Sequence, residues 1–109
     1  MRTDNLVTEV ASFLNICATG RKILGILPRS KRGLLVSEIV ARSKRSERAI
    51  RAHLKLLLQL RLIRRKKVVT KRGKLAYRYL ALQTHELIRS TKGEMRRRLR
   101  GLEAHVRSV

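Results

Sequence analysis

The chain has few aromatic and few acidic residues. It contains no tryptophan, two tyrosines and one phenylalanine, and only 7 of its 109 residues are aspartate or glutamate. Binding of single-stranded nucleic acid relies on aromatic side chains that stack on bases, so the scarcity of these residues counts against that class. It does not count against a double-stranded ligand. The sequence also has no Gly-rich phosphate loop, no nucleophile with a base placed to activate it, and no carboxylate pair, and we expect no enzyme activity.

Cysteine and histidine are equally scarce. The single cysteine, Cys17, excludes an internal disulfide framework and is typical of an intracellular chain. The three histidines, His53, His85 and His105, are dispersed and lack the spacing of a metal box. We therefore expect neither a metal nor a cofactor. Cys17 is expected to be a small buried hydrophobe, and His53 to lie at the edge of the core or to bind a phosphate.

Positive charge is what the sequence has in abundance. Its 28 lysines and arginines give a net charge of +21, and a polyanionic partner is the simplest explanation for this imbalance. Residues 21–82 hold twenty of these bases and two acids, whereas residues 1–20 hold one base and two acids. No run of about 18 apolar residues and no signal-peptide pattern is present, so we expect a cytoplasmic protein without a membrane segment.

The first half of the chain has the pattern of short amphipathic helices. Residues 5–18 place Leu6, Val10, Phe13 and Cys17 on one helix face, and Thr19-Gly20 is expected to break this helix. Residues 21–27 predict a second helix that ends at Pro28. After a short extended piece at 34–36, Ser37 is expected to cap a helix that runs to about Arg42.

The second half predicts one longer helix and a hairpin. Ser46 is a second N-cap, and the helix over about 46–60 has an apolar stripe of Ile50, Leu54, Leu57 and Leu58. Residues 62–69 and 75–82 are strand-like and flank "TKRGK", whose Gly73 suits a hairpin loop. This order predicts a mainly α fold with a small β-hairpin, a winged helix-turn-helix with additional helices at both ends.

The segments "RKILGIL", "LLVSEIVARSKRSERAIRAHLKLLLQLRLIRRKKV" and "GKLAYRYLAL" then carry a resemblance. They resemble the winged helix-turn-helix of the ArsR, MarR and TrmB-like regulators over about residues 20–82. The sequence departs from these families at Arg61, where many relatives have glycine at the end of the recognition helix. The resemblance implies a DNA-binding protein, and we expect an archaeal or archaeal-virus source.

The resemblance assigns two sets of residues to DNA contact. The recognition-helix set is Lys44, Arg45, Ser46, Glu47, Arg48, Arg51 and Lys55. Arginine forms bidentate bonds with guanine and glutamate accepts from cytosine, although Glu47 also suits helix capping, and Arg48 and Arg51 also suit phosphates. The wing set is Arg65, Lys67, Lys71, Arg72 and Lys74, placed along the backbone or in the minor groove. Only alternate residues of the strand can face one ligand.

The terminal segments, 1–19 and 83–109, flank the DNA-binding unit over 20–82 and predict a homodimer. The expected interface residues are Leu6, Val10, Phe13, Ile88, Met95, Leu99, Leu102 and Val106. The last four of these follow the 4-3-4 spacing of a coiled coil. The alternative is that both terminal helices fold back onto their own domain.

Three functions remain open from the sequence. The first is a dimeric, nucleoid-associated transcriptional regulator that binds double-stranded DNA. The second is an architectural, chromatin-like protein that coats DNA with little sequence preference. The third is an RNA-binding or ribosome-associated winged-helix protein. The sequence indicates neither an operator nor a small-molecule effector.

Overall fold

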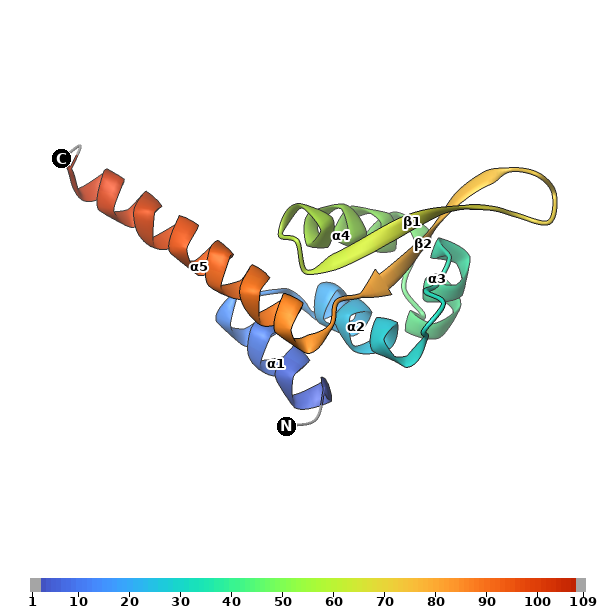
Figure 1. The fold of residues 1–109 in the computed structure, drawn as a ribbon, viewed down its shortest axis with the longest axis horizontal. Coiled ribbons are helices and arrows are strands. Elements are labelled where there is room, and N and C mark those ends of the chain that lie inside the picture. Colours follow the sequence, from blue (N-terminus) through green and yellow to red (C-terminus); the bar gives the residue numbers. More distant parts are fainter. Residues whose placement is uncertain (1–2, 108–109) are drawn as a thin grey trace.

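The computed structural model describes the backbone of residues 3–107 and the side chains of residues 5–107 (Figure 1). Its elements are α1 (Thr3–Phe13), α2 (Ala18–Ile26), the short 3-10 helix η1 (Leu27–Arg29), α3 (Val36–Ser43), α4 (Glu47–Gln59), β1 (Ile63–Val69), β2 (Leu75–Ala81) and α5 (Thr84–Arg107). β1 and β2 form one antiparallel pair. The predicted fold class is confirmed, because a mainly helical chain carries a single hairpin directly after α4.

The turn between α1 and α2 lies earlier than the sequence predicted. The chain turns at Asn15, whose φ of 57° is left-handed, a conformation that asparagine tolerates. The Ile16 amide donates to the Ala11 carbonyl at 2.8 Å and closes the end of α1. Gly20 instead lies buried inside α2, where a Cβ would come within 2.6 Å of Ile16 Cγ2. Gly20 therefore permits close packing of α2 on this turn, and Thr19-Gly20 does not break a helix.

The buried face of α1 also differs from the predicted one. The buried residues of α1 and the turn after it are Val7, Val10, Ala11, Leu14 and Ile16. Phe13 is 62% exposed, and Leu6 is partly buried against the core. The assignment of Val10 to a dimer interface is corrected here, because its side chain is buried within the chain's own core and has no surface to offer a second chain.

The start of α3 corrects a second prediction. Leu35, and not Ser37, holds the N-cap position, and its amide donates to Glu38 Oε1 at 2.9 Å. A carboxylate at the third helical position reaches back to the cap and satisfies a free amide at the helix start. Ser37 is one residue inside the helix and is exposed. The helix ends at Lys44, which has a φ of 58°.

The start and the apolar stripe of α4 are as predicted. Ser46 Oγ accepts from the Ala49 amide at 3.1 Å, which caps the helix. Ile50, Leu54 and Leu57 are each 1% exposed or less, and α4 packs on α2 and α3. These three side chains form the centre of the core.

Arg61 turns the chain from α4 into β1. Its φ is 59°, the left-handed conformation for which glycine is usual and which costs other residues roughly 1–2 kcal/mol. The next residue, Leu62, is fully buried, and its amide donates to the Leu57 carbonyl at 3.0 Å. This buried, hydrogen-bonded neighbour holds Arg61 in the geometry that glycine would adopt.

The hairpin is anchored at its base and free at its tip. β1 and β2 pair from Ile63 opposite Ala81 to Val69 opposite Leu75, and Gly73 in the loop has the expected positive φ of 77°. An isolated bridge joins Tyr79 to Leu34, which fixes the base of the hairpin to the segment before α3. Figure 1 shows the hairpin tip extending past the helices, on the side of the molecule away from α5.

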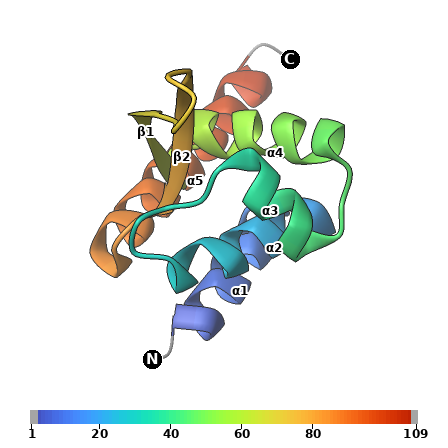
Figure 2. The same cartoon turned by 90° about the vertical axis from the view of Figure 1, so that its right-hand side faces the viewer.

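α5 has a packed half and a projecting half (Figures 1 and 2). Near its start Leu87 is buried, and midway Arg98 Nη1 donates to the Leu14 carbonyl at the end of α1 at 3.0 Å. Every side chain from Leu99 to Arg107 is exposed. The radius of gyration is 15.5 Å, against about 13 Å for a compact domain of about 100 residues, because this part of α5 extends from the body.

Candidate nucleic-acid interface

The exposed side of α4 carries the residues that the sequence assigned to the recognition helix. All of Lys44, Arg45, Ser46, Glu47, Arg48, Arg51 and Lys55 are exposed. Positions 47, 48, 51 and 55 recur at intervals of three or four residues, so they lie on one side of α4, away from its buried stripe. We call this surface, from Lys44 to Lys55, the α4 face.

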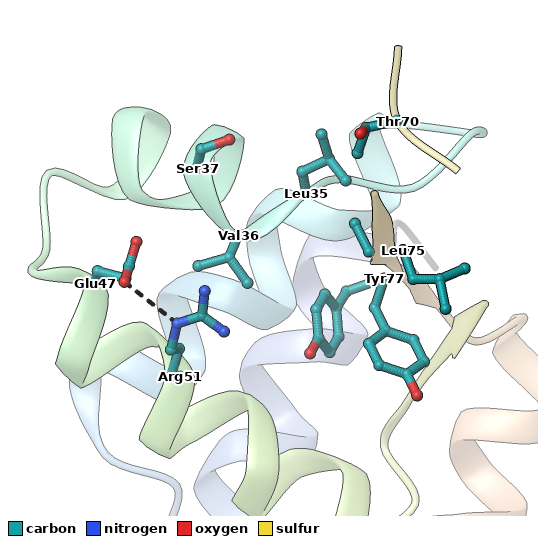
Figure 3. Close-up of a pocket in the computed structure, with 10 residues that line it drawn as sticks. Leu35, Val36, Ser37, Glu47, Arg51, Thr70, Leu75 and Tyr77 are labelled. Atoms are coloured by element: carbon teal, nitrogen blue, oxygen red, sulfur yellow. Dashed lines mark hydrogen bonds and ion pairs between the residues drawn. The ribbon is translucent and has the colours of Figure 1, made fainter. Parts of the chain in front are cut away.

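The structure adds an ion pair within the α4 face. Arg51 Nε lies 3.4 Å from Glu47 Oε2, one helical turn away, and the two side chains are 61% and 64% exposed (Figure 3). A pair this exposed contributes only about 0.2–1 kcal/mol. Glu47 therefore orients the Arg51 guanidinium, and breaking the pair needs little free energy. Arg51 can leave Glu47 and bind another hydrogen-bond acceptor.

A cleft of about 400 Å³ separates the α4 face from the hairpin (Figure 3). Its walls include Val36, Ser37, Glu47, Arg51, Leu75 and Tyr77. The sequence analysis missed the apolar wall that Val36, Leu75 and Tyr77 provide. The alternation of Leu75, Tyr77 and Tyr79 along β2 was the available signal, because alternate strand residues share one face.

The two predicted wing residues of β1 lie on the same face of the hairpin, as alternation along a strand requires. Arg65 and Lys67 lie opposite Tyr79 and Tyr77, so they share the face of the hairpin that borders the cleft. The Arg65 guanidinium stacks over the Tyr77 ring at 4.0 Å from its centroid. This cation–π contact orients Arg65, and Tyr77 is thus a positioning residue that the sequence analysis did not identify.

The other face of the hairpin holds a structural arginine. Arg78 Nη1 donates to the Gly33 carbonyl at 3.1 Å and pairs with Glu38 Oε1 at 3.2 Å. Arg78 therefore links β2 to the start of α3.

The three bases of the loop, Lys71, Arg72 and Lys74, are all exposed at the hairpin tip.

Cys17 lies where the sequence did not predict it, whereas His53 is half-buried at the edge of the core, one of the two places expected for it. Cys17 is exposed at the N-cap of α2, and its Sγ lies 2.9 Å from His53 Nε2 on α4. His53 Nδ1 lies 2.8 Å from the Ala49 carbonyl. A carbonyl only accepts, so Nδ1 carries the proton and, in the neutral ring, Nε2 accepts from the thiol. The pair links α2 to α4, and Cys17 is not the buried hydrophobe that was expected.

Neither a metal site nor a membrane helix occurs in the part of the chain that the structure describes. Within residues 5–107, no three or more histidine, cysteine, aspartate or glutamate side chains are grouped as a metal ion would require. None of the described helices combines the length and the apolar character needed to span a bilayer.

Comparison with known proteins identifies structural neighbours only. No family model matches the sequence, and no curated protein matches it significantly. A possible transcriptional regulator from Methanosarcina mazei superposes with a TM-score of 0.70 at 12% identity, over 94% of this chain and 87% of that one. The DNA complex of MepR from Staphylococcus aureus gives 0.56 at 18% identity, over 95% and 86% of the two chains.

A third neighbour is MarR from Staphylococcus aureus, in a complex with salicylate and kanamycin. It gives a TM-score of 0.54 at 19% identity, over 93% of this chain and 66% of that one. Identities this low establish the fold and nothing finer. The chain has the winged helix-turn-helix fold that it shares with these regulators.

Proposed function

We propose that this protein is a transcriptional regulator that binds double-stranded DNA as a homodimer. The observation that carries the proposal is the placement of two basic surfaces, the α4 face and the wing over 66–76, on the two sides of one cleft. In this arrangement the recognition helix over 46–60 enters the major groove, and the wing lies on the backbone or in the minor groove. The MepR neighbour was solved as a DNA complex, which is consistent with this role.

The α4 face supplies both base and phosphate contacts in this proposal. Arg48 and Arg51 reach guanine edges, and Glu47 accepts from cytosine N4 when Arg51 leaves it. The exposed, weak Glu47–Arg51 pair permits this exchange. Lys44, Arg45 and Lys55 contact phosphates, as does the Ser46 hydroxyl, whose oxygen caps α4 while its hydrogen remains free to donate.

The wing supplies the second contact. Arg65, held on Tyr77, and Lys67 point along the side of the cleft, and Lys71, Arg72 and Lys74 follow at the tip. Arginine is favoured in a narrow minor groove, whose negative potential is enhanced. The wing therefore contributes affinity with little dependence on base sequence.

The proposed dimer uses the apolar residues that the fold leaves exposed. These are Phe13 on α1 and Ile88, Met95, Leu99, Leu102 and Val106 on α5, which are between 36% and 72% exposed, with Leu6 partly buried beside them. Pairing of α5 with its copy would bury this stripe and present two α4 faces to successive major grooves, about 34–36 Å apart. A binding site with inverted half-sites follows from such a two-fold axis.

The test is a selection of sheared genomic DNA on the purified protein at about 150 mM salt, a physiological ionic strength, with double-stranded RNA as competitor. A regulator enriches a small set of fragments that share an inverted repeat. Affinity for that repeat is expected to fall roughly 10³–10⁵-fold between about 50 and 200 mM salt, if about 6–10 phosphates are contacted. A salt-independent affinity would contradict the electrostatic basis of the proposal.

The second candidate is an architectural protein that coats DNA without choosing a sequence. The observation that favours it is the extent of the positive charge, since a net charge of +21 exceeds what the α4 face and the wing contain. A flat genomic profile that resists the RNA competitor would support this candidate over the regulator. Displacement of DNA by an equal mass of RNA would favour the RNA-binding interpretation over both.

A further inference from the structure

A second basic groove lies on another part of the molecule. It has a volume of about 420 Å³ and is lined by α1, α2, η1 and the end of α3. Its charged lining residues are Arg21, Lys22, Arg29 and Arg42, and none of the described acidic residues lines it. We call this site the α2 groove.

The geometry of α2 explains why these four bases meet. One side of α2 is buried through Ile23 and Leu24, and Gly20 on that side faces His53 of α4. Arg21 and Lys22 occupy the other side of α2. Gly25 follows them on this side, and Arg29 comes one turn later, in η1. Ser43 is buried at the end of α3, which leaves the preceding Arg42 exposed toward the same groove.

The positive charge of the α2 groove is not balanced within residues 5–107. The described ion pairs join Glu38 to Arg78, Glu47 to Arg51, and Glu94 to two arginines of α5. None of them includes a base of the groove. The acid nearest in sequence is Glu38, four residues before Arg42, but it pairs with Arg78 and does not line the groove. Glu9 is exposed on α1 and does not line the groove either. Four like charges held together without a counter-charge destabilise the fold, which points to an anionic partner.

The α2 groove is separate from the cleft that the proposed function uses. The cleft is lined from α3, α4 and β2, and the groove from α1, α2, η1 and the C-terminal end of α3. In Figure 2, α2 and α1 lie below α4, whereas the hairpin tip lies above it. A duplex that lies against α4 and the wing therefore leaves the groove open.

We propose that the α2 groove binds the phosphate backbone of a second DNA duplex, so that one protein bridges two DNA segments. The inference rests on the proposed function in one respect, because the first duplex is held by α4 and the wing. Arg21 in α2 and Arg29 in η1 are eight residues apart, which corresponds to roughly 12 Å at the rise per residue of an α-helix. Bases spread over this length suit a row of phosphates better than a single small anion. Lysine and arginine contacts of this kind carry no sequence preference.

The experiment is a bridging assay. One duplex is fixed to beads and a second, labelled duplex of different sequence is captured only when protein connects the two. The test variant is Arg21→Gln/Lys22→Gln/Arg29→Gln, since glutamine keeps helix propensity and removes charge. The control, Arg96→Gln/Arg100→Gln/Arg107→Gln, removes the same charge from exposed positions of α5. Affinity for a single duplex and thermal unfolding are measured for all three proteins.

We expect the test variant to lose bridging at least tenfold while it keeps its single-duplex affinity within about threefold. Loss of three phosphate contacts should also lower the salt slope of bridging by about 2.7. Bridging at the wild-type level in the test variant, or an equal loss in the control, would overturn the inference. The proposed function is tested separately by replacing Arg48 and Arg51 with glutamine. If this variant binds a single duplex as tightly as the wild type, the proposed function is wrong, whatever the bridging assay shows.

A dimer also bridges DNA if each protomer holds a different duplex, and one further variant separates the two routes. A monomeric protein made by Leu99→Asp/Leu102→Asp keeps both the α4 face and the α2 groove. Continued bridging by this monomer at saturating protein supports the groove. Bridging that disappears with the dimer, while each monomer still binds one duplex, contradicts it.

Discussion

Two helices of this protein carry similar apolar stripes, of which one is buried and the other is exposed. In α4 the stripe of Ile50, Leu54 and Leu57 is at most 1% exposed. In α5 the stripe of Leu99, Leu102 and Val106 is between 56% and 72% exposed. Both patterns predict a helix with one apolar side. The pattern alone does not distinguish a stripe that is covered by its own chain from one that is not.

The difference follows from where each helix lies. α4 packs on α2, α3 and β1, whereas α5 packs mainly on α1 and its second half extends from the body (Figure 1). A helix of 24 residues is about 36 Å long, which is more than α1 covers. The comparison assigns the stability of the protomer to α4 and, in the proposed dimer, the association of protomers to α5.

The largest expected effect is on association. The variant Leu99→Asp/Leu102→Asp places two carboxylates in the proposed interface and should give monomers in sedimentation velocity. Loss of bivalent binding should weaken the affinity for an inverted repeat by roughly 10²–10⁴-fold. Ala104→Asp adds a carboxylate away from the stripe and should leave both measurements unchanged. A dimer mass in the double variant would refute the role given to α5.

The second effect is on the stability of the protomer. Leu57→Ala removes a fully buried side chain of α4 and should lower the free energy of unfolding by about 2–5 kcal/mol. Leu102→Ala, in the exposed stripe of α5, should lower it only at protein concentrations where dimers form. Urea unfolding at several concentrations makes this measurement. Equal, concentration-independent losses would remove the distinction between the two helices.

The third effect concerns the opposite side of α4. Arg51→Ala should cost about 1–3 kcal/mol for the preferred site and should relax preference at one base pair. Lys71→Ala/Arg72→Ala in the hairpin should weaken all duplexes alike and flatten the salt dependence. Affinities for the selected site and for a scrambled duplex report both quantities. If Arg51→Ala behaves like the hairpin variant, Arg51 contacts only phosphate.

The smallest effect uses two glycines. At Gly101 of α5 an added Cβ meets nothing within 4 Å, so Gly101→Ala should raise helix stability by about 1 kcal/mol. At Gly20 of α2 the same change places a Cβ 2.6 Å from Ile16 and should destabilise the protomer. Thermal unfolding followed by circular dichroism compares them. A stabilising Gly20→Ala would show that the packing of α2 on the turn is looser than described.

The elements were largely predictable from local patterns, and the errors have tertiary causes. The spacing of Ile50, Leu54 and Leu57 and the loop at Gly73 depend on neighbours in sequence, and both were predicted correctly. The sequence predicted a helix break at Gly20. The glycine is instead required inside α2, because any larger residue there would collide with Ile16, and this contact exists only in the folded chain. Ser37 has the residue type of a cap, but Glu38 accepts from the amide of Leu35 and so the helix begins after Leu35.

The candidate site divides in the same way. Helical periodicity placed Glu47, Arg48 and Arg51 on one face before the structure was known, and strand alternation grouped Arg65 with Lys67. The cleft, the stack of Arg65 on Tyr77 and the α2 groove join residues that are far apart in the sequence. Their distances depend on the register of the hairpin and on how the helices and the hairpin pack together, which periodicity within one element does not determine.

The hydrogen bond from Arg98 to Leu14 has a consequence for the lifetime of the protein in a cell. It is the last described hydrogen bond between α5 and the body, and every described side chain from Met95 onward is exposed. In an unpaired protomer the following nine residues, 99–107, form a frayable helix end of the kind that proteases cut first. A paired protomer would shield the same segment. If the proposed dimer forms, unpaired chains should therefore be degraded faster than paired ones.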